Sequence, residues 1–135
     1  MSTRADQMSA APILTGLRVG AVLAAAAVVL AVVGLTPSFS WVPELALLLT
    51  ATLIPVIGFG FAGYRSAAQS HRALDGMIAG AVAGLLSGLV GGLSYVAFGK
   101  PLLNVIVGAA IGAVGGAVVG AIAALLAVRD RGASS

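Results

Sequence analysis

The residues of this chain that best resemble a chemical motif are three glycines. Residues 56–65 read VIGFGFAGYR, in which Gly58, Gly60 and Gly63 form the G-x-G-x-x-G pattern of dinucleotide-binding loops. Such a loop follows a strand and needs an acid about 20 residues later to hold the ribose. Here the flanking residues are apolar, and the next acid, Asp75, comes too early. We therefore expect no nucleotide site at these glycines.

Ionisable and metal-ligating residues are too scattered for a catalytic or metal centre. His71 is the single histidine and cysteine is absent, which excludes thiol chemistry and a cysteine metal site. The spans predicted below put Glu44 and Asp75 on opposite sides of a membrane, so these two acids cannot form a carboxylate pair. No nucleophile, base and acid meet at one depth. The sequence thus predicts no enzyme activity, no cofactor and no bound metal.

Composition explains why the chain offers so little chemistry. Of its 135 residues, 60% are hydrophobic and 8% are charged, and its mean hydropathy is +1.13. These values predict an integral membrane protein. Four long intervals of the sequence contain no ionisable residue (Asp, Glu, Lys, Arg or His). They run from Arg18 to Glu44, from Glu44 to Arg65, from Asp75 to Lys100 and from Lys100 to Arg129. Each interval is long enough for one span of roughly 20 residues.

The predicted fold is all-α, an integral membrane four-helix bundle in a single transmembrane domain over residues 14–128. Its helices are expected at about 14–35, 43–64, 74–98 and 102–128. Residues 1–13 and 129–135 are expected to be cytoplasmic tails. The first helix could also be a cleaved signal peptide, although its uncharged run is longer than a usual signal core.

Basic residues indicate the orientation of the bundle. Lys and Arg in short loops are retained on the cytoplasmic side. The side that holds both termini and the middle loop carries Arg4, Arg18, Arg65, Arg72, Arg129 and Arg131, whereas the other side carries Lys100. We therefore predict a multi-pass protein of the cell inner (plasma) membrane with both termini in the cytoplasm.

The middle loop is expected to hold a small basic cluster of Arg65, His71 and Arg72. Its predicted partners are the lipid bilayer and its anionic headgroups, which lie near Arg65 and Arg72. A cluster of this size does not suggest nucleic acid.

Glycine recurs at every fourth position of the last two predicted helices. The series consists of Gly76, Gly80, Gly84, Gly88 and Gly92 in one helix and of Gly108, Gly112, Gly116 and Gly120 in the other. Residues four apart share one face of a helix, so each series forms a groove without side chains. Membrane helices approach closely along such grooves. We predict glycine-zipper packing at these nine residues, either within the chain or between chains.

Polar side chains at membrane depth are few, and Thr50, Thr52, Ser87 and Ser94 are expected to bond carbonyls of their own helix. Buried ionisable residues mark most ion and proton pathways. The predicted spans contain none near their centres, which disfavours a proton-coupled carrier. Pro55 is expected to bend the second helix.

The segment FAGYRSA, followed by ALDGMIAGAVAGLLSGL, resembles the small glycine-rich four-helix membrane proteins of unknown function found in haloarchaea and actinobacteria. The resemblance covers residues 58–93. The basic, acid-poor loops depart from the haloarchaeal members and favour the actinobacterial type. The resemblance implies a prokaryotic inner membrane protein and supplies no site residues.

Two functions fit these observations. One is a structural or interaction module with no chemistry of its own. The alternative is an oligomeric channel or small-solute permeation unit, in which several copies surround a pathway. The candidate protein partners are accordingly a homo-oligomer or another membrane protein.

Overall fold

The computed structural model describes residues 4–132, which form four long α-helices and one short 3-10 helix. Helix α1 covers Arg4–Leu35, α2 covers Glu44–Ser70, α3 covers Ala73–Ala97 and α4 covers Leu103–Gly132, while the 3-10 helix η1 covers Pro37–Phe39. Each of the four long helices is long and apolar enough to cross a membrane. The predicted all-α fold is confirmed, as is the prediction of four helices with the length and composition of membrane spans.

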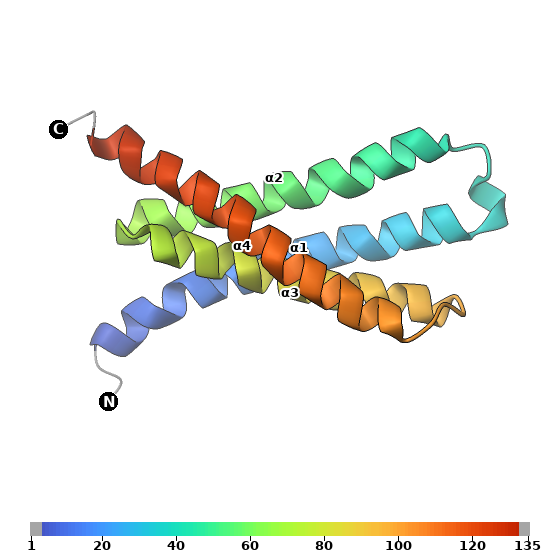
Figure 1. The fold of residues 1–135 in the computed structure, drawn as a ribbon, viewed down its shortest axis with the longest axis horizontal. Coiled ribbons are helices and arrows are strands. Elements are labelled where there is room, and N and C mark those ends of the chain that lie inside the picture. The colour runs from blue at the N-terminus through green and yellow to red at the C-terminus, as the bar shows by residue number, and fades with distance from the viewer. Residues whose placement is uncertain (1–3, 133–135) are drawn as a thin grey trace.

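The two ends of the bundle hold different connections (Figure 1). One end contains the α1–α2 connection with η1 and the tight α3–α4 connection, in which Gly99 has a φ of 80°. We call it the hairpin end. The opposite end contains both ends of the described chain and the short α2–α3 connection. We call it the terminal end.

Helix α2 runs further toward the terminal end than the predicted boundary at 64. The residues that follow Arg65 are good or tolerable helix formers, and the helix ends only at Ser70. His71 then adopts a left-handed φ of 61°, and its N–H donates to the Ala67 carbonyl at 2.8 Å. Arg65 therefore lies in α2, and its expected place in a loop was wrong. A charged residue therefore need not mark the end of a helix.

The core of the bundle is made of small residues. Most buried side chains are alanine or glycine, and Leu23 and Phe59 are the only large apolar residues among the buried ones described. Leu23, Phe59, Ala62, Ala79 and Ala83 form the main buried cluster. Large apolar side chains lie instead on the outer surface of all four helices. Lipid solvates such a surface, and helices in lipid associate through small residues.

Helix α2 has buried residues only in its terminal half. Its buried residues are Phe59, Ala62, Gly63, Ser66 and Ala67. Over residues 44–58, all of which the structure describes, none is buried. The closest pair of helices is α3 and α4, whereas α1 and α2 share far less contact. The hairpin half of the bundle is consequently the more open half.

Candidate functional site

The glycines of α3 and α4 lie opposite one another along an antiparallel interface. The facing pairs are Gly76 and Gly120, Gly80 and Gly116, Gly84 and Gly112, and Gly88 and Gly108. A Cβ atom added to Gly84 would collide with the carbonyl oxygen of Gly112, and the reverse is also true. The backbones are thus closer than any side chain would permit. We call this set of facing glycines the α3–α4 interface.

The two ends of the α3–α4 interface differ from its middle. At the hairpin end Gly92 faces no glycine, and an added Cβ would lie 2.5 Å from the Val105 Cα and 2.6 Å from the Asn104 carbonyl oxygen. At the terminal end a Cβ on Gly76 would lie 2.6 Å from the carbonyl oxygen of Gly63. Gly63 also lies against Gly120. Three helices therefore meet there with only the small side chain of Ala124 beside the glycines.

The G-x-G-x-x-G pattern lies inside α2 rather than in a loop. Its last glycine, Gly63, packs against Gly120 as described above. A Cβ on Gly60 would make only an ordinary contact of 3.8 Å with the Val119 side chain, whereas one on Gly58 would collide with Leu23 at 2.7 Å. Two of the three glycines therefore serve close packing of α2 against α1 and α4.

Two glycines beside the regular series face a different environment. A Cβ on Gly115 would meet nothing within 4 Å, and one on Gly91 would meet only the Ala27 side chain, at 3.6 Å. Close helix packing therefore does not require glycine at either position. Both residues instead line a cavity.

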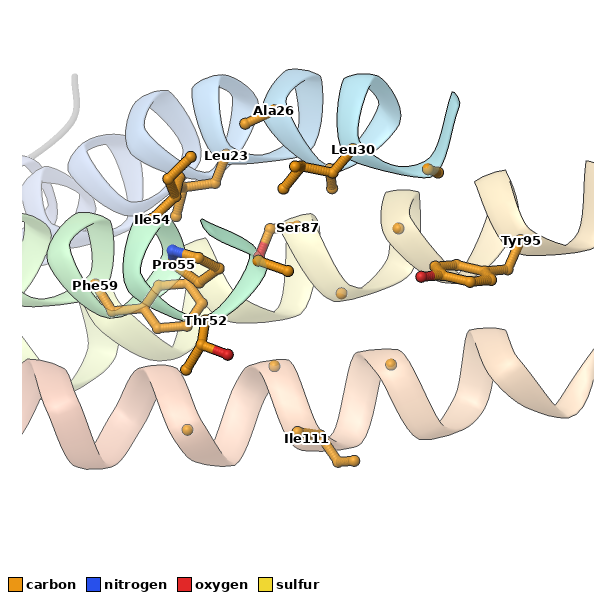
Figure 2. Close-up of a pocket in the computed structure, with 18 residues that line it drawn as sticks. Leu23, Ala26, Leu30, Thr52, Ile54, Pro55, Phe59, Ser87, Tyr95 and Ile111 are labelled. Atoms are coloured by element: carbon orange, nitrogen blue, oxygen red, sulfur yellow. The ribbon is translucent and has the colours of Figure 1, made fainter. Parts of the chain in front are cut away.

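The cavity has a volume of about 440 Å³ and receives residues from all four helices. Figure 2 shows its wall, with Leu23 and Leu30 from α1, Thr52 and Phe59 from α2, Ser87 and Tyr95 from α3, and Ile111 from α4. Its inner end rests on Leu23 and Phe59, which also belong to the main buried cluster. The volume falls within the range of about 300–1,000 Å³ that is typical of ligand pockets.

A smaller space of about 250 Å³ adjoins the cavity toward the hairpin end. Leu30, Ala51 and Tyr95 line both spaces, and the smaller one also contacts Glu44. The Tyr95 ring stands between them, with its hydroxyl turned toward Ser87 (Figure 2). Glu44 is the only residue with a formal charge among the lining residues of the two spaces.

The four hydroxyl groups that were predicted to bond carbonyls of their own helices do so. The bonds run from Thr50 to the Ala46 carbonyl at 2.7 Å, from Thr52 to Leu48 at 2.8 Å, from Ser87 to Gly84 at 3.2 Å and from Ser94 to Val90 at 2.8 Å. These hydroxyl protons are already donated, so Ser87 and Thr52 offer the cavity acceptor lone pairs only.

Charged residues lie mainly near the helix ends, with Arg18 and Arg65 as partial exceptions. Arg18 stands about two turns inside the candidate span Ala10–Leu35 and is exposed. Arg65 also lies inside its helix, and its guanidinium carbon sits 6.0 Å from the centre of the Phe61 ring. Long basic side chains can extend along apolar surface toward the headgroups. Glu44 begins α2 and Asp75 lies in the first turn of α3, so these acids stand at opposite ends.

Sequence reasoning did not reveal the cavity. The only sequence feature that hinted at the cavity was a pair of glycines, Gly91 and Gly115, that fall outside the four-residue spacing. The cavity also depends on α2 lying apart from the other helices in its hairpin half, and no local sequence pattern predicts that arrangement.

The fold and its composition define the class of this chain as a multi-pass, four-helix membrane protein. Comparison with protein-family models, with curated proteins and with solved structures finds no match.

Proposed function

We propose that this chain is a structural or interaction module of the membrane with no chemistry of its own. The observation that carries the proposal is that the glycine faces of α3 and α4 contact each other within one chain. We propose that these contacts act as a glycine zipper, held by van der Waals and close-approach polar interactions. The outer surface then consists mainly of large apolar side chains, which suit lipid or the helix of another membrane protein.

The proposed orientation places both termini in the cytoplasm of a prokaryotic cell, with the protein in the inner (plasma) membrane. Arg65, Arg72 and Arg129 lie in the terminal half of the bundle, and Lys100 lies at the hairpin end. This distribution supports cytoplasmic termini by the positive-inside rule. Arg65 and Arg72 are exposed and would contact anionic headgroups there.

Reporter fusions test the orientation. A fluorescent protein that folds only in the cytoplasm should be bright when fused to the C-terminus. It should be dark when inserted into the connection between α1 and α2. The reverse result would overturn the proposed orientation.

The second candidate function is an oligomeric channel or permeation unit for small solutes. The observation in its favour is that the cavity reaches inward from the hairpin end and includes Ser87 and several glycines. Against it, the cavity ends on Leu23 and Phe59, and the glycine faces of α3 and α4 are already occupied by each other. A pathway would need further opening or neighbouring copies.

Two measurements on the same preparation separate the candidates. The first is the mass of the assembly released from lipid nanodiscs, and the second is flux of K⁺ and glycerol in liposomes. The module predicts flux equal to that of protein-free liposomes, whether the chain is alone or bound to a partner. A flux that rises with protein amount, together with a defined homo-oligomer, would overturn the module in favour of the channel.

A further inference from the structure

We propose that the 440 Å³ cavity holds one acyl chain of a lipid from the leaflet at the hairpin end, with an ammonium headgroup beside Glu44. The inference depends on insertion of the four helices in a membrane. It does not depend on the proposed role as a module, nor on which side of the membrane is cytoplasmic.

The depth of the cavity matches one leaflet. Its inner lining residues Leu23, Phe59 and Ser87 lie close to the midpoints of their candidate spans. From Leu23 to Ala31, which lies further toward the hairpin end, the rise along α1 is about 12 Å. One leaflet contributes about 15 Å of the hydrocarbon core. The cavity therefore extends from near the bilayer centre toward the headgroups of a single leaflet.

The chemistry of the wall suits a hydrocarbon chain. Apart from the hydroxyls of Thr52, Ser87 and Tyr95, the lining side chains are apolar, and many are alanine or glycine. An apolar cavity of this kind does not retain water well. Gly115 contributes open space, because a Cβ added there would meet nothing within 4 Å. The wall thus leaves room for a flexible apolar chain.

The cavity is accessible from the lipid. Ile54 of α2 and Ile111 of α4 both line it, and both are exposed on the outer surface. The adjacent part of α2 over residues 44–58 has no buried residue. An acyl chain can therefore enter sideways between α2 and α4 while its headgroup stays at the membrane surface.

Charge favours an ammonium headgroup. The smaller space between the cavity and the hairpin end contacts Glu44, which has no basic neighbour among the lining residues. An amine-bearing headgroup would place its positive charge near this carboxylate. Because Glu44 is exposed, the attraction should give only a modest preference, about two- to fivefold over a lipid with an anionic headgroup.

Native mass spectrometry of the full chain can test the proposal. The protein is placed in nanodiscs that contain equal amounts of phosphatidylethanolamine and phosphatidylglycerol with the same acyl chains, and the lipids retained on release are counted. The wild type should retain one lipid per chain, with a two- to fivefold preference for phosphatidylethanolamine. Gly115→Leu, which fills the cavity, should reduce retention at least tenfold.

Matched variants distinguish loss of binding from loss of fold. Ala110→Leu adds the same side chain at an exposed position of α4 outside the cavity and should retain lipid like the wild type. Gly91→Leu fills the cavity from α3 and replaces Gly115→Leu if that variant does not fold. Glu44→Gln should retain a lipid but lose the headgroup preference.

Several results would overturn the proposal. Equal retention by the wild type and both cavity-filling variants would show that the lipid binds elsewhere. Release of the wild type without lipid would exclude a lipid occupant. This holds whether the protein is then a monomer or a dimer whose second copy covers the cavity. Equal retention of the two lipids by the wild type would refute the ammonium headgroup.

Discussion

Helices α3 and α4 contact each other more extensively than any other pair, whereas α1 and α2, which also form a hairpin, touch each other much less. The difference follows from side-chain size. Facing glycines let the backbones of α3 and α4 meet directly. Facing leucines such as Leu30 and Leu47 instead border an open space. In lipid, apolar bulk alone gives little reason for two helices to associate.

One small bundle thus combines a closely packed part, the α3–α4 interface, with an open part, the hairpin half of α2. The α3–α4 interface forms within one chain, and α2 has buried residues only in its terminal half. The cavity lies where α2 leaves the other helices. Some residues, such as Gly88 and Gly112, belong to both the interface and the cavity wall, whereas Gly80 and Gly116 belong to the interface alone and Gly115 lines the cavity alone. Substitutions at residues of the second kind should separate stability from cavity volume.

The strongest test of this contrast is a leucine in the middle of the α3–α4 interface. Gly84→Leu should lower the free energy of unfolding by about 3 kcal/mol or more, because its Cβ would collide with the backbone of Gly112. Reversible unfolding in mixed detergent micelles, followed by circular dichroism, measures the effect. The neighbouring Leu85 is exposed, so Leu85→Ala should change stability by less than about 0.5 kcal/mol. Similar losses from both variants would refute the interface as the main source of stability.

Adjacent glycines of α4 offer a finer comparison. Gly116→Ala should cost about 2 kcal/mol, because the new Cβ would strike the Gly80 carbonyl oxygen. Gly115→Ala meets open space and should be neutral or stabilise by up to about 1 kcal/mol through helix propensity. The same unfolding assay applies to both. If Gly115→Ala proved as harmful as Gly116→Ala, glycine at these positions would serve helix flexibility rather than close approach.

The sequence was sufficient to predict four helices and the glycine faces on two of them, but not the open half of the bundle. Intervals without charge indicated four helices, and the four-residue spacing indicated the glycine faces. The spacing does not decide between packing within one chain and packing between chains, and the structure pairs the two faces within the chain. The charge-free intervals and the four-residue spacing are local features, so one sequence is enough to predict them. The cavity depends on where α2 leaves its neighbours, which is a property of the whole bundle.

The end of α2 was mispredicted for a different reason. A left-handed residue that ends a helix is usually glycine or asparagine, and the chain has His71 at that position. Residue 71 therefore lacks the usual signal, and Arg65, the first charged residue after the uncharged interval, predicts a boundary that is too early.

His71→Gly should stabilise the protein by about 1 kcal/mol, because glycine adopts a φ of 61° without the steric cost of a Cβ. His71→Ala keeps the Cβ and should give no such gain, which makes it the control. Both variants can be followed by the same unfolding assay. A gain from alanine equal to that from glycine would show that the imidazole, rather than the backbone conformation, carries the cost.

The smallest expected effects concern the hydroxyl groups, which differ between the two hairpins. Thr52→Val should change the free energy of unfolding by less than about 0.5 kcal/mol, because its hydroxyl bonds only the carbonyl of Leu48 in an exposed part of α2. Ser87→Ala should cost more, about 1 kcal/mol, since Ser87 is buried beside the α3–α4 interface and donates to Gly84. Unfolding of the two variants in parallel gives the difference. A larger loss of stability from Thr52→Val than from Ser87→Ala would contradict this expectation. It would mean that the hairpin half of α2 depends on Thr52 and that the α3–α4 interface does not depend on Ser87.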